Sequence, residues 1–513
     1  MYPVFCSILY NRVQDRITRE TREAPASFTD LNLDQIVNAV TGSKQEYDLK
    51  PFFYSPLSDA ETVRYRQQVA QDIERGMLLE SIRSFAEKMV RMRRHLGSIP
   101  QLYYRYHKAG WYLEAAAAYC EAVTGLVRDL SAVDLQSDGL SAFRAYLTDY
   151  ARSDAFVSLV EETDKLRAEL SAVRYCVIIK GRLVKVRRYE GETDYSAEVE
   201  KTFAKFRQGT VKGRRASLAG GSGMSHVEAR ILDLVAKLYP EAFAHLDQYC
   251  AKHSDYLDET IAVFDREVQF YVAYLEYIGP IKQAGLPFCY PQVSETSKEV
   301  CSEDGFDLAL ANKCVAEGST LVCNDFYLEN PERIFVVSGP NQGGKTTFAR
   351  TFGQLHYLAS LGCPVPGKKA KLFLFDQLLT HFEREEDIRN LRGKLQDDLV
   401  RVHAILRQAT SCSIILMNEA FTSTALQDAV FLSKEIMQAI IDLDLLCVCV
   451  TFIDELASLS EKSVSMVSTV VPENPALRTF KIVRKQADGL AYALSIAEKH
   501  RLRYDQLKER IQA

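Results

Sequence analysis

A glycine-rich stretch after residue 333 decides how the fold is interpreted. Residues 334–347 read Ile-Phe-Val-Val-Ser-Gly-Pro-Asn-Gln-Gly-Gly-Lys-Thr-Thr, and a helical pattern continues to Ala359. A short apolar run, a cluster of glycines and an amphipathic segment predict a strand, a tight loop and a helix. The segment fits the pattern G-x-x-x-x-G-K-[ST], whose backbone N–H groups surround phosphate oxygens at the start of a helix.

This loop predicts a nucleotide site for ATP and Mg²⁺. Lys345 is expected to reach the β- and γ-phosphates, and the Thr346 hydroxyl is expected to ligate Mg²⁺. The alternative, a glycine-rich turn with a structural role only, stays open at this point. The residues predicted to contact the nucleotide are Gly339, Pro340, Asn341, Gln342, Gly343, Gly344, Lys345, Thr346 and Thr347.

A second predicted strand, residues 412–417, ends in Asn418 and Glu419. A polar pair at the tip of a neighbouring strand serves such a site by holding the metal and activating water. Glu419 is the candidate general base, together with Lys345 as the other catalytic residue. Asn418 is neutral, so it would contact Mg²⁺ through a bound water and more weakly than a carboxylate. An exposed acid without a catalytic role is the alternative for Glu419.

Composition excludes several classes of protein. Hydrophobic residues make up 47% of the 513 residues, charged residues 26%, and the formal net charge is −5. These values exclude a disordered chain and a uniformly basic coat protein for nucleic acid, although a local basic patch is compatible with them. Without a signal-like start or a run of eighteen apolar residues, we expect a cytoplasmic protein with no membrane partner. The 12 cysteines form no C-x-x-C pair, which favours free thiols over zinc or disulfides.

The periodicity predicts an α + α/β protein. Helical patterns extend from about residue 57 to 170 and from 226 to 278, and strands alternate with helices after Gly279-Pro280. We expect an N-terminal segment at 1–48, a long-helix core domain at 49–285, and an α/β P-loop domain at 286–513. A small β-containing insertion is expected at about 175–225, with two short strands around Gly181.

The end of that insertion is basic. Residues 201–225 contain six basic side chains and no acidic one, which suits a DNA backbone or a solvated linker equally well. The six are Lys201, Lys205, Arg207, Lys212, Arg214 and Arg215.

Two motifs together resemble the ATPase domain of the DNA mismatch repair MutS family. Residues 339–346 are similar to that family's G-P-N-M-G-G-K-[ST] loop, and residues 414–424 are similar to its L-M-D-E-x-G-x-G-T-[ST] segment. The likeness covers roughly residues 286–513, with Asn324-Asp325 before the loop and Phe480 to Ile496 after it. Upstream, the order of helices and β-containing insertion resembles the family's core or lever domain with its DNA clamp. The N-terminal mismatch-binding domain has no visible counterpart.

The resemblance implies an ABC-type ATPase that dimerises through its nucleotide sites. ATP would lie between Lys345 and Thr346 of one subunit and two loops of the other, at 393–396 and 423–428. The homodimer would close around duplex or structured DNA in repair or recombination. Leu391, Leu395, Leu399, Val402 and Leu406 predict a helix after the first of these loops, with Asp397, Asp398 and Arg401 on its other faces.

Three departures from the family pattern predict slow hydrolysis. Asn418 replaces an aspartate, Phe452 follows Thr451 where the family has histidine, and residues 393–396 lack the signature serine. Lys394 is a possible electrostatic substitute for that serine, or a solvated lysine. A different class stays open: an ATP-gated protein-interaction scaffold with little hydrolysis and no DNA role. A P-loop kinase or transferase is a third and weaker alternative.

Some properties are not predicted by the sequence. The preferred DNA structure, mismatch recognition and possible repair partners are among them. The adenine pocket is also open, because Phe326 or Tyr327 would suit either stacking on the base or packing in the core.

Overall fold

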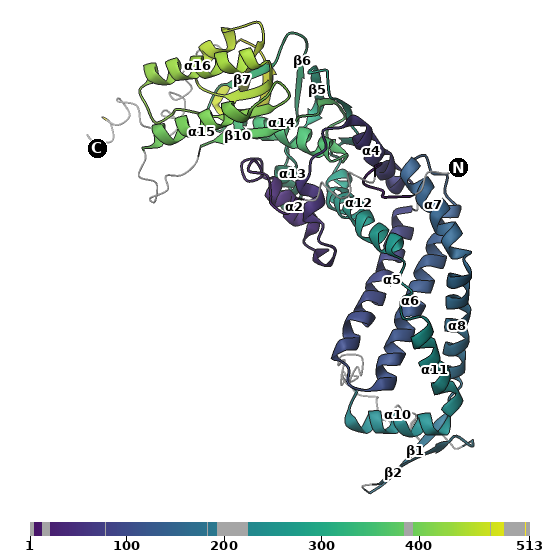
Figure 1. The fold of residues 1–513 in the computed structure, drawn as a ribbon. Helices are drawn as coiled ribbons and strands as arrows, with labels where there is room; N and C mark the ends of the chain where they lie inside the picture. Colours follow the sequence, from purple (N-terminus) through teal and green to yellow (C-terminus); the bar gives the residue numbers. More distant parts are fainter. Residues whose placement is uncertain are drawn as a thin grey trace. The chain divides into compact units, whose positions relative to one another are not determined.

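The computed structural model describes residues 5–12, 21–76, 78–181, 183–191, 224–383, 393–471, 473–486 and 508. The chain mixes helices and sheets, as the predicted α + α/β class requires (Figure 1). It divides into two compact units. We call Met1–Phe5, Gly76–Asp134 and Ser141–Asp265 the helical unit, and Cys6–Arg75, Leu135–Leu140 and Arg266–Ala513 the sheet unit.

This division does not coincide with the predicted bounds at residues 48 and 285. Residues 6–75 and 266–285 pack with the C-terminal part of the chain rather than with the long helices. As domain bounds, 1–48, 49–285 and 286–513 stay a prediction.

Long helices build the helical unit because their apolar residues recur at helical spacing. In α5 the buried residues Leu78, Ile82, Phe85, Met89 and Met92 are three or four positions apart, which places them on one face. That face packs along α6. The helices here are α5 (Leu78–Ser98), α6 (Arg105–Ser131), α8 (Asp154–Ser171), α10 (His226–Leu238) and α11 (Pro240–Lys252), with η2 (Ile99–Gln101); α7 (Asp138–Ala151) and α12 (Glu259–Gln283) contain residues of both units.

A two-stranded hairpin belongs to the helical unit. The strands β1 (Tyr175–Lys180) and β2 (Leu183–Arg188) pair antiparallel, from Tyr175 opposite Arg188 to Lys180 opposite Leu183. Gly181 has a φ of 64°, which a turn glycine adopts without strain. The two strands predicted around Gly181 are therefore confirmed. Lys201, Lys205, Arg207, Lys212, Arg214 and Arg215 of the predicted basic segment lie outside the described residues.

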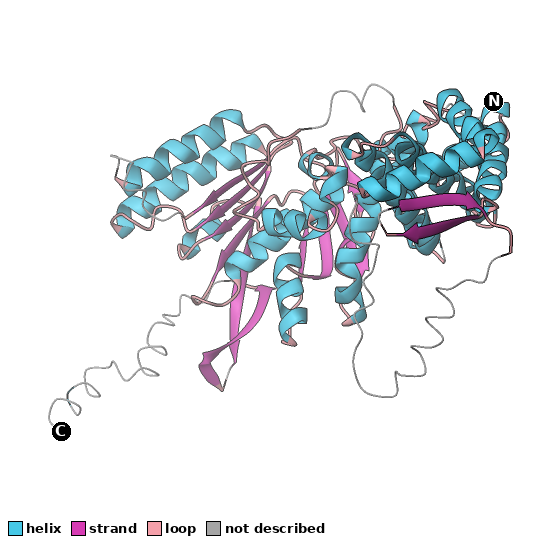
Figure 2. Cartoon of the chain, turned by 90° about the horizontal axis from the view of Figure 1, so that it is seen from below, coloured by secondary structure: helices cyan, strands magenta, loops and turns pink. Residues whose placement is uncertain are grey.

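The sheet unit is centred on a six-stranded sheet in the order β10-β11-β12-β7-β13-β14. Its first five strands are parallel, and β14 pairs antiparallel with β13. Strands lie between helices in Figure 2. The strands are β7 (Ile334–Ser338), β10 (Leu378–Phe382), β11 (Ile414–Asn418), β12 (Leu446–Val450), β13 (Ser463–Val471) and β14 (Asn474–Arg484), and the helices are α14 (Lys345–Ser360), α15 (Lys394–Gln408) and α16 (Leu426–Leu443), with η3 (Asp454–Ser458).

Alternation along β7 gives this sheet two apolar faces. Ile334 belongs to a buried cluster with Val402 of α15 and Ile440 of α16. The next residue, Phe335, contacts Phe348 of α14 on the other face, with ring centroids 5.9 Å apart. Because successive strand residues point to opposite sides, a continuous apolar strand is buried on both faces. The loop that follows β7 is thus fixed to a rigid core.

A smaller sheet and the N-terminal helices complete the sheet unit. The second sheet has the order β4-β9-β5-β6, and a further pair joins β3 to β8. Helix α4 begins after Asp59, whose carboxylate accepts the N–H groups of Glu61 and Thr62. The elements are α2 (Leu33–Thr41), η1 (Gln45–Tyr47), α3 (Lys50–Tyr54), α4 (Ala60–Glu74), β3 (Phe288–Cys289), β4 (Gln292–Ser294), β5 (Val300–Gly305), α13 (Leu308–Glu317), β6 (Asn324–Leu328), β8 (Val365–Pro366) and β9 (Lys369–Phe373).

Residues of the N-terminal part hold α14 along its length. The Arg350 Nε donates to the Asp30 carbonyl at 2.9 Å, and the Gln354 Nε2 donates to the Leu31 carbonyl at 2.8 Å. Nearer the end of the helix, the Tyr357 hydroxyl donates to a carbonyl of α3. These buried hydrogen bonds make α14 a fixed element of the sheet unit.

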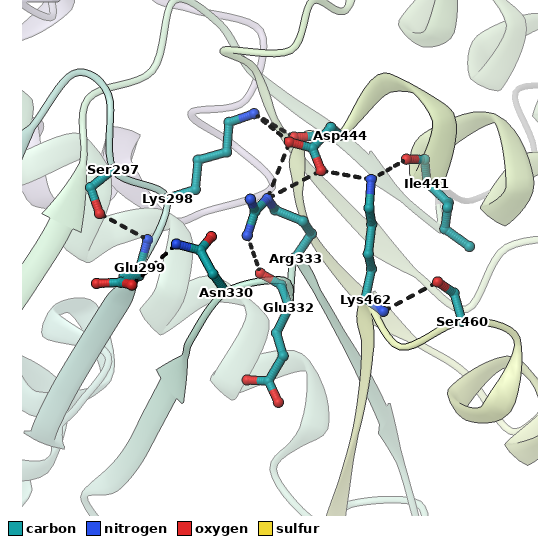
Figure 3. A network of polar contacts seen from close by, with 10 residues as sticks. All are labelled: Ser297, Lys298, Glu299, Asn330, Glu332, Arg333, Ile441, Asp444, Ser460 and Lys462. Atoms are coloured by element: carbon teal, nitrogen blue, oxygen red, sulfur yellow. Dashed lines mark hydrogen bonds and ion pairs between the residues drawn. The ribbon is translucent and has the colours of Figure 1, made fainter.

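An ionic cluster lies at the amino edge of the six-stranded sheet. Asp444, which ends α16, accepts contacts from Lys298, Arg333 and Lys462 (Figure 3). The Lys462 Nζ is 2.7 Å from Asp444 Oδ1, and Lys298 Nζ is 3.1 Å from Oδ2. Although burial raises the pKa of Asp444, the hydrogen bonds from Lys462 and Lys298 and the charge of Arg333 lower it to about 2. We call these four residues the Asp444 cluster.

Among the described residues, the helices are too short or too polar to cross a bilayer.

Candidate phosphate-binding site

The predicted strand, loop and helix are present around residue 339. β7 ends at Ser338, α14 begins at Lys345, and Gly339 and Gly344 adopt φ values of 113° and 92°. Residues other than glycine rarely adopt such backbone angles, so the turn requires glycine at both positions. A Cβ on Gly343 would lie 2.2 Å from the Ser468 Oγ, so this position also excludes a side chain. The loop therefore follows the backbone path that its glycines predict.

Lys345 points back over the loop. Its Nζ donates to the Gly339 carbonyl at 2.9 Å, the Pro340 carbonyl at 3.3 Å and the Asn341 Oδ1 at 3.3 Å. Its side chain is only 5% exposed, and the Glu419 Oε1 lies 3.8 Å from the Nζ. Burial lowers the pKa of Lys345, the Glu419 carboxylate raises it, and a nearby arginine lowers it; the net effect is a lower pKa. The ammonium group is thus held mainly by neutral oxygens.

Thr346 and Asn418 meet at the carboxyl edge of the sheet. The Thr346 Oγ1 donates to the Asn418 Oδ1 at 2.9 Å, although β12 lies between β7 and β11 in the sheet. Asn418 is buried at the end of β11. Hydroxyl and amide oxygens are hard donors of the kind that Mg²⁺ accepts. The two residues that the sequence analysis assigned to the metal are therefore in direct contact.

Glu419 occupies a sharp turn at the end of β11. Its φ is 53°, and its N–H donates to the Val450 carbonyl at 2.9 Å. Phe421 also has a positive φ, 61°, and is completely buried. Left-handed angles are unfavourable for residues of this kind, and the buried ring and the hydrogen bond hold the turn in place. The turn leaves the Glu419 carboxylate 30% exposed beside Lys345.

Two residues that contact the loop were missed by the sequence analysis. The Ser468 Oγ of β13 donates to the Gly343 carbonyl at 2.7 Å, and the Arg478 Nε of β14 donates to the Asn341 carbonyl at 3.2 Å. Both are more than 120 positions away along the chain. A local motif gives no signal for such contacts, because they depend on the pairing of β13 with β7 and β14.

The strands before and after the loop also meet. The Asn324 Nδ2 donates to the Phe480 carbonyl at 3.1 Å, and its Oδ1 accepts the Ile482 N–H at 2.7 Å. Phe326 packs in the core with the rings around Phe335, whereas Tyr327 is 46% exposed beneath the Arg484 guanidinium. Core packing of Phe326 is thus confirmed.

The structure shows the neighbours of Phe452 and Lys394, two positions where the sequence departs from the family pattern. Phe452 is 51% exposed, and Thr451 uses its Oγ1 to accept the Ile453 N–H at 3.0 Å. The Lys394 Nζ bonds to the Glu383 carboxylate of its own chain. Residues 384–392 and 487–496, which include Leu391, lie outside the described residues.

The predicted placement of Asp398 is wrong. Asp398 is buried, and its Oδ1 lies 3.4 Å from the His381 Nε2 of β10, whereas Leu399 is 36% exposed. The reason is that Asp398 shares the inward face of α15 with Val402, four residues on. Burial raises the pKa of the Asp398 carboxyl, although nearby Arg401 opposes this.

Metal ligation by protein side chains alone is not indicated. The residues that the structure describes contain no group of three or more His, Cys, Asp or Glu side chains able to hold a metal ion. Any Mg²⁺ at Thr346 and Asn418 would therefore depend on oxygens from water and from a bound phosphate.

Comparison with known proteins agrees with this geometry. The family model described as MutS domain V matches residues 335–507. The DNA mismatch repair protein MutS of Thermotoga maritima is 28% identical over 207 residues, which is 39% of this chain and 26% of the relative. The protein of the same name from Zymomonas mobilis is 30% identical over 186 residues, 35% of this chain and 21% of the relative. The chain thus spans about a quarter of the length of the curated relatives it matches.

The matched region contains the parts of the site described above. It begins within β7 and includes the loop, Lys345, Thr346, Asn418 and Glu419. The resemblance noted from the two motifs is confirmed, because residues 335–507 match the MutS domain V model and the relatives reported above are MutS proteins.

Proposed function

We propose that the chain is a MutS-like ATP-binding protein and slow ATPase that dimerises through its nucleotide sites and binds duplex or structured DNA. The single observation that carries this proposal is the position of Lys345. Its buried ammonium bonds to three oxygens of the glycine-rich loop and lies 3.8 Å from Glu419. A cation held in this way is ready to exchange neutral partners for a phosphate.

In this proposal the loop and the first turn of α14 hold ATP. The contacting residues would be Gly339 to Thr347, through the Lys345 ammonium and backbone N–H groups, which Pro340 lacks. Contact between Lys345 and Glu419 would give way to contact between Lys345 and the β- and γ-phosphates. The exchange is favourable because the buried ammonium gains charged phosphate oxygens at hydrogen-bond distance in place of carbonyl dipoles and a carboxylate 3.8 Å away.

The oxygens of Thr346 and Asn418 fit a Mg²⁺ ion. When bound, Mg²⁺ neutralises charge on the phosphate oxygens. Thr346 would ligate it directly, and Asn418 would hold one of its waters. Asn418 contributes no charge, so we expect weaker retention of the ion than an aspartate would give.

Glu419 is the residue proposed to accept a proton from the attacking water. Its carboxylate is accessible, and its backbone is fixed by the turn at the end of β11. Turnover would be slow for two reasons. Asn418 would hold Mg²⁺ less tightly than an aspartate would. The exposed ring of Phe452, just after β12, cannot form a hydrogen bond near the γ-phosphate.

Exposed apolar side chains support the proposed homodimer. Leu399 and Val400 of α15 are 36% and 45% exposed, and Leu426 and Phe431 of α16 are 64% and 62% exposed. Apolar residues exposed together on neighbouring elements favour a protein interface. Because Lys394 is engaged with Glu383, residues 423–428 are the better candidate for contacting the partner's nucleotide; they comprise the end of the loop before α16 and the start of that helix.

DNA binding is proposed for the β1–β2 hairpin. The register places Lys180, Lys185 and Arg187 on one face of the hairpin. Lys180 and Lys185 are exposed, which suits contact with a phosphate backbone. The apolar tip gives weight to a second candidate, because Ile179 and Leu183 are 72% and 66% exposed and would suit a protein partner. That candidate is an ATP-gated scaffold without a DNA role.

One experiment separates the two candidates. ATP hydrolysis and retention on DNA would be measured with plain, mismatched and branched duplexes over a range of salt concentrations. A DNA-binding protein should lose affinity steeply as salt rises, and Lys180→Ala with Lys185→Ala should flatten that dependence. Lys313→Ala in α13 is the control, since it removes another exposed lysine from a different surface. Absence of retention at low salt would leave the scaffold as the remaining candidate.

A further inference from the structure

We infer that Arg478 is a second phosphate-binding residue of this site, and that it makes the site prefer a nucleoside triphosphate to a diphosphate. The inference rests on the proposed function, since it concerns the same nucleotide. It adds a residue from β14, outside the loop motif, with a specific role in reading the third phosphate.

Arg478 and Lys345 share one loop residue. The Arg478 Nε donates to the Asn341 backbone carbonyl at 3.2 Å, and the Lys345 Nζ donates to the Asn341 side-chain oxygen at 3.3 Å. β14 brings the arginine there through its pairing with β13, where Arg478 lies opposite Val470. Two cationic side chains from distant parts of the chain therefore converge on Asn341.

The charges around Asn341 favour an anion. Burial is the main cause of the lowered pKa of Lys345, and the positive charge of Arg478 lowers it further, against the opposing effect of Glu419. Among the described residues, the carboxylate that forms an ion pair with Lys345 is Glu419, at the long distance of 3.8 Å. A bound phosphate would relieve the repulsion between Lys345 and Arg478.

The position of Asn341 indicates which phosphate Arg478 reaches. In a loop of this type the N–H groups near the helix start surround the α- and β-phosphates, and the lysine reaches the β- and γ-phosphates. Asn341 lies four residues before Lys345 and touches the end of its side chain. Arg478 therefore lies on the side of the loop where we expect the γ-phosphate of a bound triphosphate.

This assignment also addresses the missing signature serine. Residues 393–396 contain none, and Lys394 is engaged with Glu383 of its own chain. A cation from the same chain would supply a hydrogen-bond donor to the phosphate in place of the neutral serine hydroxyl that the partner subunit lacks. Arginine suits this role because its planar group can keep one N–H on the Asn341 carbonyl while others face a phosphate.

Binding of ATP and ADP, measured separately, tests the inference. Fluorescent analogues of each nucleotide would be titrated with Mg²⁺ into the purified full chain and into Arg478→Gln. Loss of one charged contact should weaken ATP binding roughly ten- to a hundredfold. ADP affinity should be unchanged, so the ratio of the two affinities falls toward one. Arg478→Lys, which keeps the charge, should retain part of the preference.

A matched control uses the other arginine of the same strand. Arg484 pairs with Glu332 and lies over Tyr327, so Arg484→Gln should leave the ATP-to-ADP ratio at the wild-type value. Thermal unfolding without nucleotide checks that the variants fold, and Arg478→Lys serves if Arg478→Gln does not. Equal weakening of ATP and ADP, or an unchanged ratio, would overturn the inference while leaving the proposed function intact. Failure of the wild-type chain to bind either nucleotide would overturn both.

Discussion

The two edges of the six-stranded sheet use charge in opposite ways. At the amino edge, Asp444 is surrounded by three cations from separate connecting segments, with two N–O distances of 2.7 and 3.1 Å (Figure 3). At the carboxyl edge, Lys345 bonds to neutral oxygens while the carboxylate of Glu419 stays at 3.8 Å.

The difference separates a stabilising cluster from a binding site. Charges that are closely paired within the fold contribute to stability and have little left for a ligand. Charges held by neutral or more distant partners are suited to exchange those partners for a ligand. Four substitutions test this contrast, beginning with the largest expected effect.

The largest effect is expected for Lys345→Ala. It removes the cation proposed to hold the β- and γ-phosphates, so ATP affinity should fall at least about a hundredfold. Isothermal titration with ATP and Mg²⁺ measures this. Lys462→Ala at the amino edge is the matched control, and it should lower the free energy of unfolding while leaving ATP affinity unchanged. An equal loss of ATP binding in both variants would contradict the view that only the carboxyl edge binds the nucleotide.

Glu419→Gln should separate binding from turnover. An amide of the same shape cannot take a proton from water, so the rate of hydrolysis should fall roughly a hundredfold or more. ATP affinity should be kept or improved, because the competing carboxylate near Lys345 is lost. Steady-state phosphate release and a binding titration measure the two quantities. Hydrolysis at the wild-type rate would remove Glu419 as the base.

Asn418→Asp should strengthen Mg²⁺ binding at the carboxyl edge of the sheet. A carboxylate beside Thr346 adds one charge-assisted contact, worth about 1.5–3 kcal/mol, so turnover should rise roughly tenfold and less Mg²⁺ should be needed. The measurement is the hydrolysis rate as a function of Mg²⁺ concentration. An unchanged Mg²⁺ requirement would show that Asn418 does not face the ion.

Asp444→Asn is expected to give the smallest effect, and on stability only. More than a third of the Asp444 side chain is exposed, so solvent screens its ion pairs and we expect a loss of about 1 kcal/mol at neutral pH. The folded-state pKa of about 2 lies below the value for a free carboxyl. The contribution of Asp444 is therefore complete above about pH 4 and is lost as the pH falls towards 2. Urea unfolding of both proteins at pH 7 and near pH 3 tests this, since their difference should shrink in acid.

The sequence predicted what is local and missed what depends on distant pairing. The loop from Gly339 to Thr346 could be predicted because its strand, glycines and helix are contiguous and each has a physical requirement. Asn418 was placed near it because parallel strands end at the same edge. Ser468 and Arg478 were not found, since each reaches the loop from a strand whose register the sequence does not show.

Helix faces and compact units illustrate the same limit. Asp398 was expected on an outer face of its helix, yet it is buried opposite His381. A single buried contact between a carboxyl and an imidazole cannot be predicted from an apolar periodicity, which assigns every charged residue to the outer faces of a helix. The two compact units were also missed, because each is assembled from segments that alternate along the chain.

Equilibrium dialysis of the purified chain against labelled ATP with Mg²⁺ tests the central claim most directly. The account predicts saturable uptake of one ATP per chain, displaced by unlabelled ATP and reduced when Mg²⁺ is chelated. No uptake at protein concentrations where the chain is folded would contradict the assignment of the loop around Lys345 as a triphosphate site.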